Sequence, residues 1–384
     1  METFLTIVFF VSILAIALLW RAREKESPGR SSTSVKKPPS GGVTVVPPVI
    51  PAPDAASLPD PQGEGPKGTL RKSLRDNIGG IFPGEGEPSR NCSAPLAYED
   101  VKKDVMDEVM AEVKALKSFR TDHRRLQKIL NDQALQIGSE LSKMVTSDPV
   151  LTIKILNTVN SPYYGLPQKV DSIGHAMLLL GIVRLREILY RNGLLNLFRT
   201  EDPFQNDIVE NLWKHATLTS ICASHLHRLY SDLDRGTLFT MGLLHDVGKL
   251  ILLKWVGVER YPRNLTIGEE EAIVGINHEI IGRMALETWG FSDLMVSVIE
   301  QHHAPSFCEL KDLDMDGQRK KYLIVLFFAD QLAKLILNGE KADNVEPFLS
   351  SYLPMIDRQR FLDISIDDVL LSSITQSEVF AEGG

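Results

Sequence analysis

Cysteine is scarce in this chain. Its 384 residues include only Cys92, Cys222 and Cys308, which lie far apart and form no Cys-x-x-Cys pair. An odd number of cysteines at such spacing argues against both a disulfide framework and a zinc–thiolate site. The scarcity also fits a reducing compartment.

Acidic residues outnumber basic ones over most of the chain. The net charge is −8, although residues 21–75 hold ten Lys and Arg against five Asp and Glu. The acidic excess therefore lies in the remainder of the chain. Because an acidic body repels phosphate backbones, we expect no direct binding to nucleic acid.

A long apolar run occurs once, over residues 4–20, where 17 residues carry no charge. As a helix the run would span roughly 25 Å, enough for a short membrane span. Glu2 precedes it without any Lys or Arg, which disfavours a cleaved signal peptide. Arg21, Arg23 and Lys25 follow it, and positive charge marks the cytoplasmic side. The sequence predicts a single-pass transmembrane anchor at 4–20 in the inner membrane, with the body in the cytoplasm.

Residues 21–95 are rich in Pro, Gly and Ser, as in "KKPPSGG" and "VVPPVIPAPD". Such segments bury little apolar surface, so we predict a disordered linker. The island "GTLRKSLRDNIGGIF" could form a short basic helix that touches anionic lipid headgroups. A solvated linker is the favoured interpretation.

The remainder, residues 96–384, has a helical pattern. Val101, Val105, Val109 and Val113 recur with charged residues between them. Strand alternation and internal repeats are both missing. The sequence predicts an all-α helical bundle.

Seven of the nine histidines lie between residues 215 and 303, in separate helical segments. Successive positions are about one helix and one connection apart, so each helix of a bundle could deliver ligands to a common centre. The histidines and the aspartates in these segments give the candidate metal ligands His215, His245, Asp246, His278, His302, His303 and Asp330. We interpret His123, His175, His225 and His227 as structural core residues.

Imidazole and carboxylate together suit divalent Fe or Mn, so we predict one or two such ions. An Asp beside a His can bridge two metals that activate a water. Lys249 lies three residues after Asp246 on the same helical face. It could neutralise phosphate charge or pair with Glu300. A shared polar centre without metal is the alternative.

The ordered ligand set, with "LLHDVGK" at its centre, resembles that of the HD phosphohydrolase superfamily. The segments "SDPVLTIKILNTVNSPYYG", "DSIGHAMLLLGIVRLREIL" and "EQHHAP" resemble the HD-related output domain (HDOD) family over about residues 116–338. The resemblance implies an HD-like helical bundle and a role in signal transduction.

The paired histidines are followed by Ala304, Pro305, Ser306 and Phe307. The HD-GYP subgroup, which hydrolyses cyclic di-GMP, carries a Glu and then an Asp-Gly-x-Gly-Tyr-Pro run there. This departure disfavours cyclic di-GMP hydrolysis.

Two functions remain open. The first is a membrane-anchored signal-transduction output module that acts through interaction with unidentified signalling protein partners or a nucleotide ligand. The second is a metal-dependent phosphohydrolase acting on a nucleotide or cyclic dinucleotide. In that case Asp246 and Lys249 would be catalytic, with Lys249 stabilising negative charge. Metal content distinguishes the two.

Overall fold

A computed structural model describes residues 66–82, 95–116, 145, 149–161, 164, 166, 168–198, 200–338, 345–375 and 377–381. Across these residues the secondary structure is entirely helical, and no strand occurs. The predicted all-α fold class is confirmed. The anchor predicted at 4–20 lies outside the described residues.

The helices before the His/Asp segments begin at points that the sequence marks. They are α2 (Pro66–Asn77), α3 (Lys103–Ala115), α6 (Pro149–Val159), α7 (Ile173–Phe198) and α8 (Pro203–Leu226). Proline occupies the first position of α2, α6 and α8, where its missing N–H costs nothing. Asp202 caps α8 by accepting from the backbone N–H of Phe204 and of Gln205.

The following helices carry most of the His/Asp positions. They are α9 (Arg235–Leu244), α10 (Val247–Arg260), α11 (Ile267–Val274), α12 (His278–Trp289), α13 (Asp293–Glu300) and α14 (Gly317–Asn338). Asn277 caps α12 through the Ile280 N–H. Gly275 and Gly290 end α11 and α12 in the left-handed conformation that favours glycine. The chain closes with α15 (Arg358–Ser365), α16 (Asp368–Thr375) and α17 (Glu378–Ala381).

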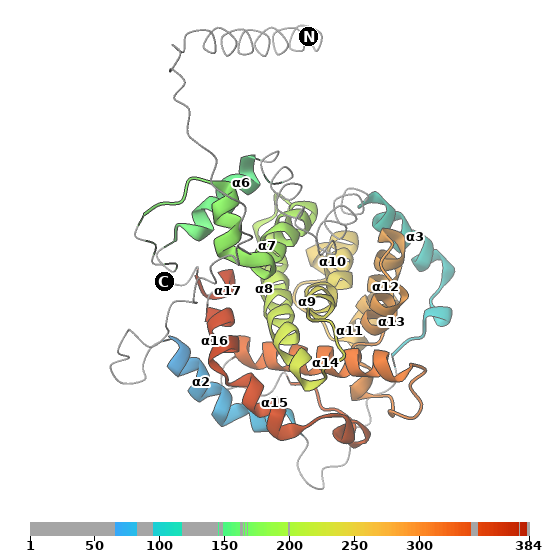
Figure 1. Cartoon of the computed structure of the whole chain (residues 1–384). Coiled ribbons are helices and arrows are strands. Elements are labelled where there is room, and N and C mark those ends of the chain that lie inside the picture. The colour runs from blue at the N-terminus through green and yellow to red at the C-terminus, as the bar shows by residue number, and fades with distance from the viewer. Residues whose placement is uncertain are drawn as a thin grey trace, which may run out of the picture. The chain divides into compact units, whose positions relative to one another are not determined.

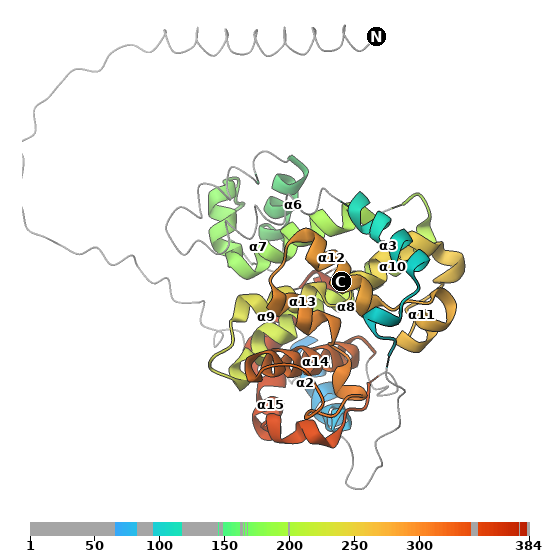
Figure 2. The ribbon, with the colours of Figure 1, turned by 90° about the vertical axis from the view of Figure 1, so that its right-hand side faces the viewer.

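The main core lies between α8, α9, α10, α12, α13 and α14. Helix α8 packs against α9 and α14, and α12 packs against α10 and α13 (Figures 1 and 2). Helix α3 covers α12 and α10 with Val109 and Val113, which are fully buried. The segments that carry the candidate ligands therefore meet in the middle of one bundle.

Helices α6 and α7 have a separate, smaller apolar core. It includes Ile155, Val159, Leu185 and Ile188 and is distinct from the main cluster. Ser172 caps α7 as its position suggests, by accepting from the His175 N–H. His175 itself is exposed, so its interpretation as a core residue is wrong.

Helix α2 departs from the linker predicted at 21–95. The short 3₁₀ turn Ile78–Ile81 follows it, and Leu74, Ile78, Ile81 and Phe82 are all buried in the main core. The ring of Phe82 lies 5.5 to 6.1 Å from those of Phe328, Phe348 and Phe361. The folded body thus begins at least 30 residues earlier than the predicted 96.

Arg71 connects α2 to the C-terminal segment by an ion pair with Asp368 and a hydrogen bond to the Ile366 carbonyl.

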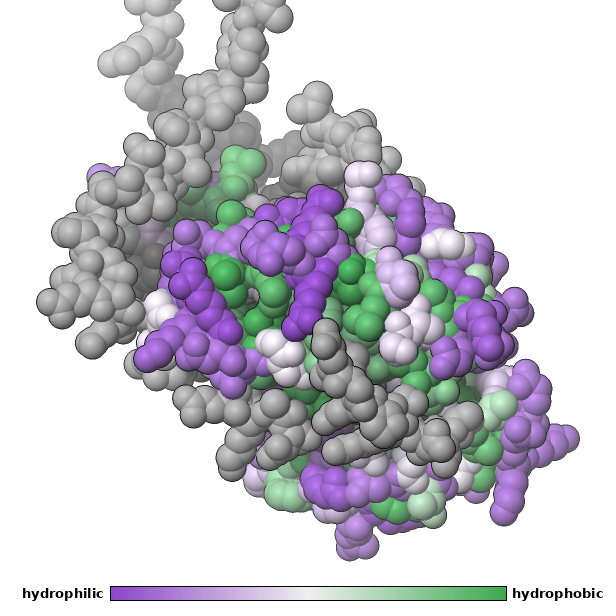
Figure 3. All heavy atoms as spheres, turned by 90° about the horizontal axis from the view of Figure 1, so that it is seen from below, coloured by the Kyte–Doolittle hydropathy of each residue, from purple (hydrophilic) through white to green (hydrophobic). Residues whose placement is uncertain are grey.

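Figure 3 views the molecule from below, the side where α2 and α15 lie in Figure 1. Hydrophilic and hydrophobic side chains are interspersed over the described part of that face.

One described segment is long and apolar enough to cross a membrane. It is Arg235–Arg260, and 83% of its apolar window is buried within the fold. This segment consists of α9, the His245–Asp246 link and α10. It is therefore a core segment of the bundle.

Candidate metal centre

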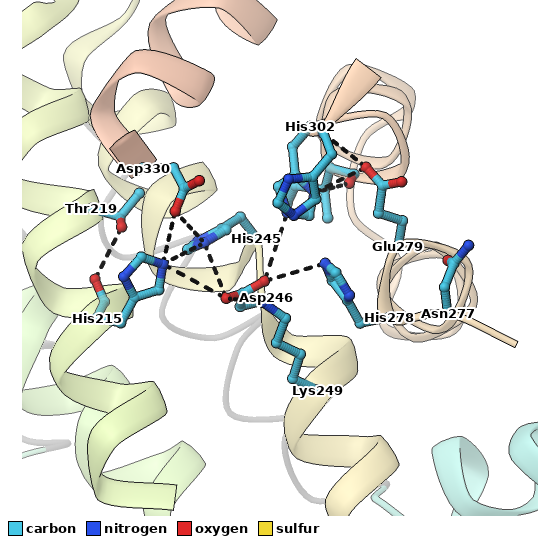
Figure 4. A network of polar contacts seen from close by, with 12 residues as sticks. His215, Thr219, His245, Asp246, Lys249, Asn277, His278, Glu279, His302 and Asp330 are labelled. Carbon is cyan, nitrogen blue, oxygen red and sulfur yellow. Dashed lines mark hydrogen bonds and ion pairs between the residues drawn. The ribbon is translucent and has the colours of Figure 1, made fainter. Parts of the chain in front are cut away.

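All seven predicted ligands meet in the interior of the bundle, and Figure 4 labels each of them except His303. Helix α8 supplies His215, the link between α9 and α10 supplies His245 and Asp246, and α12 begins with His278. His302 and His303 follow α13 after Gln301, and Asp330 lies on α14. None of the seven is more than 7% exposed. The structure brings the whole predicted set together, while the role of each residue as a ligand stays a prediction.

Asp246 lies between two groups of histidines. Its Oδ2 is 3.4 Å from His245 Nε2 and 3.7 Å from His215 Nε2. Its Oδ1 is 3.4 Å from His278 Nε2 and 3.7 Å from His302 Nε2. One carboxylate therefore faces both groups, which is the arrangement that a bridging ligand requires.

The first half-site comprises His215, His245 and Asp330. His215 Nε2 lies 2.9 Å from Asp330 Oδ1 and 3.2 Å from His245 Nε2. The second half-site comprises Asp246, His278, His302 and His303, whose ligand atoms all lie within 4.8 Å of one another. Each half-site thus offers at least three N or O donors, and Asp246 also reaches the first.

Four potential metal-ligand atoms of the second half-site lack a hydrogen-bond partner among the described residues. They are Asp246 Oδ1 and the Nε2 atoms of His278, His302 and His303. Buried polar atoms are nearly always satisfied, so a cluster of unsatisfied ones requires an explanation. A divalent cation between them would accept all four lone pairs.

The opposite ring nitrogens hold the imidazoles in place. Nδ1 of His245 donates to the Gly242 carbonyl at 2.8 Å, and Nδ1 of His302 donates to the Ile299 carbonyl at 2.7 Å. Because a carbonyl can only accept, these bonds place the hydrogen on Nδ1. Nε2 is then left to face the centre, as in metal-binding histidines.

Carboxylates hold two further rings. Nδ1 of His278 contacts Glu270 Oε2 at 2.7 Å, and Nδ1 of His303 contacts Glu346 Oε2 at 2.7 Å. Glu279 accepts from the backbone N–H of His303 at 2.9 Å. Sequence reasoning missed these three acidic residues. Glu270 and Glu279 lie near His278 in the sequence, and that proximity was the available signal.

The electrostatics favour neutral imidazoles beside charged carboxylates. Burial lowers the pKa of His302 to about 4 and that of His278 well below its ordinary value. Burial would raise the pKa of Asp246, but the charges of His245 and Lys249 outweigh it and hold that pKa well below normal. These are the protonation states that metal binding requires.

His245 differs from the other rings. Burial would lower its pKa, but the carboxylates of Asp246 and Asp330 outweigh burial and raise the pKa to about 9. A cation at the first half-site would therefore replace a proton on this ring.

Two lysines, Lys249 buried and Lys334 partly buried, balance the two aspartates. Lys249 Nζ lies 2.9 Å from Asp246 Oδ2, and Lys334 Nζ lies 2.7 Å from Asp330 Oδ2. The pairing suggested between Lys249 and Glu300 is wrong, because Glu300 contacts Arg283 at 2.6 Å. Lys249 is therefore the ion-pair partner of Asp246. No motif in the sequence predicts the corresponding role of Lys334.

Two glycines allow the His245–Asp246 link to fit between its neighbours. A Cβ on Gly248 would lie 2.0 Å from the His278 carbonyl oxygen. A Cβ on Gly242 would lie 2.6 Å from Ser220 Cα. Glycine is therefore required on both sides, and this explains the Gly that precedes Lys249 in "HDVGK".

Comparisons with known proteins agree with this architecture. Residues 116–305 match the HDOD domain model. The HDOD match ends before the predicted residue 338, so Asp330 lies beyond it.

A curated protein from Treponema pallidum (strain Nichols), named as uncharacterized, is 23% identical over 188 residues, or 46% of this chain. The match spans only 36% of that relative's length.

Two solved structures are similar beyond the HDOD match. One, from Marinobacter aquaeolei VT8, is named as an inferred signal transduction protein. It has 18% identity and a TM-score of 0.50, over 83% of this chain and 66% of the other. The other, from Shewanella amazonensis SB2B, is named as an inferred phosphohydrolase. It has 17% identity and a TM-score of 0.49, over 71% of this chain and 98% of the other. The first similarity supports the fold.

Proposed function

We propose that this chain is a signal-transduction output protein whose His/Asp centre binds one or two divalent ions, Fe or Mn. The observation that carries the metal proposal is the cluster of four buried donors around Asp246 that lack hydrogen-bond partners among the described residues. The HDOD match and the signal-transduction name of the Marinobacter protein support the signalling role.

The residues present fit such ions. His215, His245 and Asp330 would hold one ion, His278, His302 and His303 would hold the other, and Asp246 would contact both. A bound divalent ion supplies a Lewis acid and lowers the pKa of a coordinated water. The protein contributes the fixed rings, the neutral imidazoles and exclusion of solvent.

A metal-dependent phosphohydrolase acting on a nucleotide or cyclic dinucleotide is the second candidate. The complete donor set with Asp246 between its halves favours it. Two observations favour the output role. Lys249 is only 6% exposed at its side chain and is engaged by Asp246, so it does not present its charge to a phosphate. Residues 304–306, which follow the paired histidines, are buried, so their side chains do not present a surface to a substrate.

The remaining parts of the proposal rest on sequence alone. We propose that residues 4–20 anchor the chain in the inner membrane, with the body in the cytoplasm, because Arg21, Arg23 and Lys25 follow the apolar run. The proposed partners are unidentified signalling proteins. We expect no direct contact with nucleic acid, since the body is acidic.

Metal analysis of the full chain, purified in mild detergent without chelator, tests the proposal. We expect one or two equivalents of Fe or Mn, and a severe loss in Asp246→Asn with the fold retained. Added Mn should raise the melting temperature of the wild type. The metal proposal would be wrong if the folded wild type contained no metal and its melting temperature did not change with chelator or with added Mn. Turnover of nucleotides or cyclic dinucleotides by the loaded protein would favour the phosphohydrolase.

A further inference from the structure

We propose that Glu346 and Lys334 form a clamp that positions one residue of each half-site and so couples the two metal positions. Both residues lie outside the HDOD match at 116–305. This inference rests on the proposed metal function and assigns to that centre a positioning pair that no sequence motif marks.

The clamp is a continuous chain of short contacts. Glu346 Oε2 lies 2.7 Å from Nδ1 of His303, in the second half-site. Glu346 Oε1 lies 2.7 Å from Lys334 Nζ. Lys334 Nζ in turn lies 2.7 Å from Oδ2 of Asp330, in the first half-site. The orientation of His303 is thereby tied to that of Asp330.

The backbone of Glu346 is held by α14, the helix that carries Asp330 and Lys334. Its N–H donates to Gln331 Oε1 at 2.7 Å, and Gln331 Nε2 donates to Asp330 Oδ2 at 3.0 Å. Gln331 is completely buried. These bonds close a ring with Lys334, so the position of Glu346 relative to α14 is fixed by both main chain and side chain.

The segment after Glu346 is fastened to the core. Leu349 donates its backbone N–H to the Pro305 carbonyl at 2.9 Å, close to His303. The ring of Phe348 lies 5.1 Å from that of Phe328 and 6.1 Å from that of Phe82. The N-terminal segment at 66–82 thus helps to seat the residue that orients His303.

Both carboxylate oxygens of Glu346 are used by this network, one by His303 and one by Lys334. Its side chain is also 33% exposed, whereas those of the seven candidate ligands are 9% exposed or less. Glu346 is therefore assigned as a positioning residue that acts through His303. Partners that orient a metal-bound histidine commonly contribute 10- to 100-fold to metal affinity.

The signs of two substitutions separate positioning from simple charge. If Glu346 and Lys334 acted on the metal only through the electrostatic effect of their charges, removing the Glu346 carboxylate would weaken metal binding and removing the Lys334 ammonium would strengthen it. If they form a clamp, both removals weaken binding. The double variant should then lose about as much as either single variant, because the clamp is already broken.

Two measurements on the metal-depleted full chain test the clamp. Titration with MnCl2 gives the Mn affinity, and the visible absorption spectrum of the Co(II)-loaded protein reports the geometry of the site. We expect Glu346→Ala and Lys334→Met each to weaken Mn binding by about 10- to 100-fold and to change the Co(II) spectrum. Glu346→Gln, which keeps an acceptor for His303, should fall between wild type and Glu346→Ala. It carries the same test if the alanine variant does not fold.

Asp367→Asn is the matched control. Asp367 lies in the same C-terminal region and makes a partly buried ion pair with Arg228 at 2.6 Å, away from the centre. Its metal affinity and Co(II) spectrum should equal those of the wild type. Tighter Mn binding by Lys334→Met, or unchanged binding by both single variants, would overturn the clamp while leaving the metal function intact. A folded wild type that binds no Mn would overturn both.

Discussion

The α6–α7 unit and the bundle from α8 to α14 are both helical packings, but they differ in what they bury. The interior between α6 and α7 is apolar, with residues such as Ile155, Val159 and Ile188. The bundle buries histidines, aspartates and Lys249 among its apolar side chains. Burying polar groups is costly unless they are paired or bind a ligand. Folding alone therefore explains the first interior, whereas the second leaves buried polar atoms without hydrogen-bond partners among the described residues, which a bound ligand would satisfy.

Backbone spacing provides the strongest contrast between the two regions. Gly248→Ala would place a methyl group 2.0 Å from the His278 carbonyl oxygen. Relief requires α10 and α12 to separate, so we expect a loss above about 4 kcal/mol or failure to fold. Gly174→Ala in α7 meets only Ser172 Oγ, at 3.9 Å. It should be neutral or stabilising by up to about 1 kcal/mol. Chemical denaturation measures both, and equal effects would remove the contrast.

Truncation of the small core should separate stability from metal binding. Ile155 is fully buried between α6 and α7, so Ile155→Ala should cost about 3 kcal/mol of unfolding free energy. Mn affinity of the folded protein should not change, since the residue belongs to the separate core. Asp246→Asn should show the converse, with lost metal and a largely retained fold. If Ile155→Ala weakened Mn binding tenfold, the two regions would have to be treated as one unit.

A smaller effect concerns pH and a histidine away from the centre. His225 in α8 is buried beside Ser373, and burial lowers its pKa to about 4. The unfolded chain takes up a proton near pH 6.5, so wild-type stability is present above that pH and is lost as the pH falls toward 4. His225→Gln should remove about 2 kcal/mol of this loss at pH 5. His175→Gln, at an exposed site in α7, should leave the pH profile unchanged. Denaturation at pH 5 and 7.5 compares them.

The features predictable from the sequence were those with local signals. Helical periodicity indicated the all-α fold. The histidine segments indicated a common centre, because each is one helix and a connection from the next. The motif "LLHDVGK" contributed both Asp246 and the glycine that its packing requires.

The missed features depend on partners far away in the sequence. Leu74, Ile78 and Phe82 are sparse in a basic, Gly- and Pro-rich segment, and the surface that they bury against includes Phe328 and Phe361. Their spacing alone could not show that such a surface exists. Glu346 belongs to no motif that would mark it in the sequence. Its role depends on a chain segment that returns to His303 after α14.

Lys249 and Lys334 have a consequence for the order of folding and metal loading. In many metal sites the carboxylates repel one another until a cation arrives, so folding waits for the ion. Here Asp246 and Asp330 each have an ammonium partner, Lys249 and Lys334 respectively. The empty centre can consequently persist in a folded chain. Under the proposed metal function, occupancy is then a variable of the mature protein, able to follow the supply of metal, rather than a condition of its assembly.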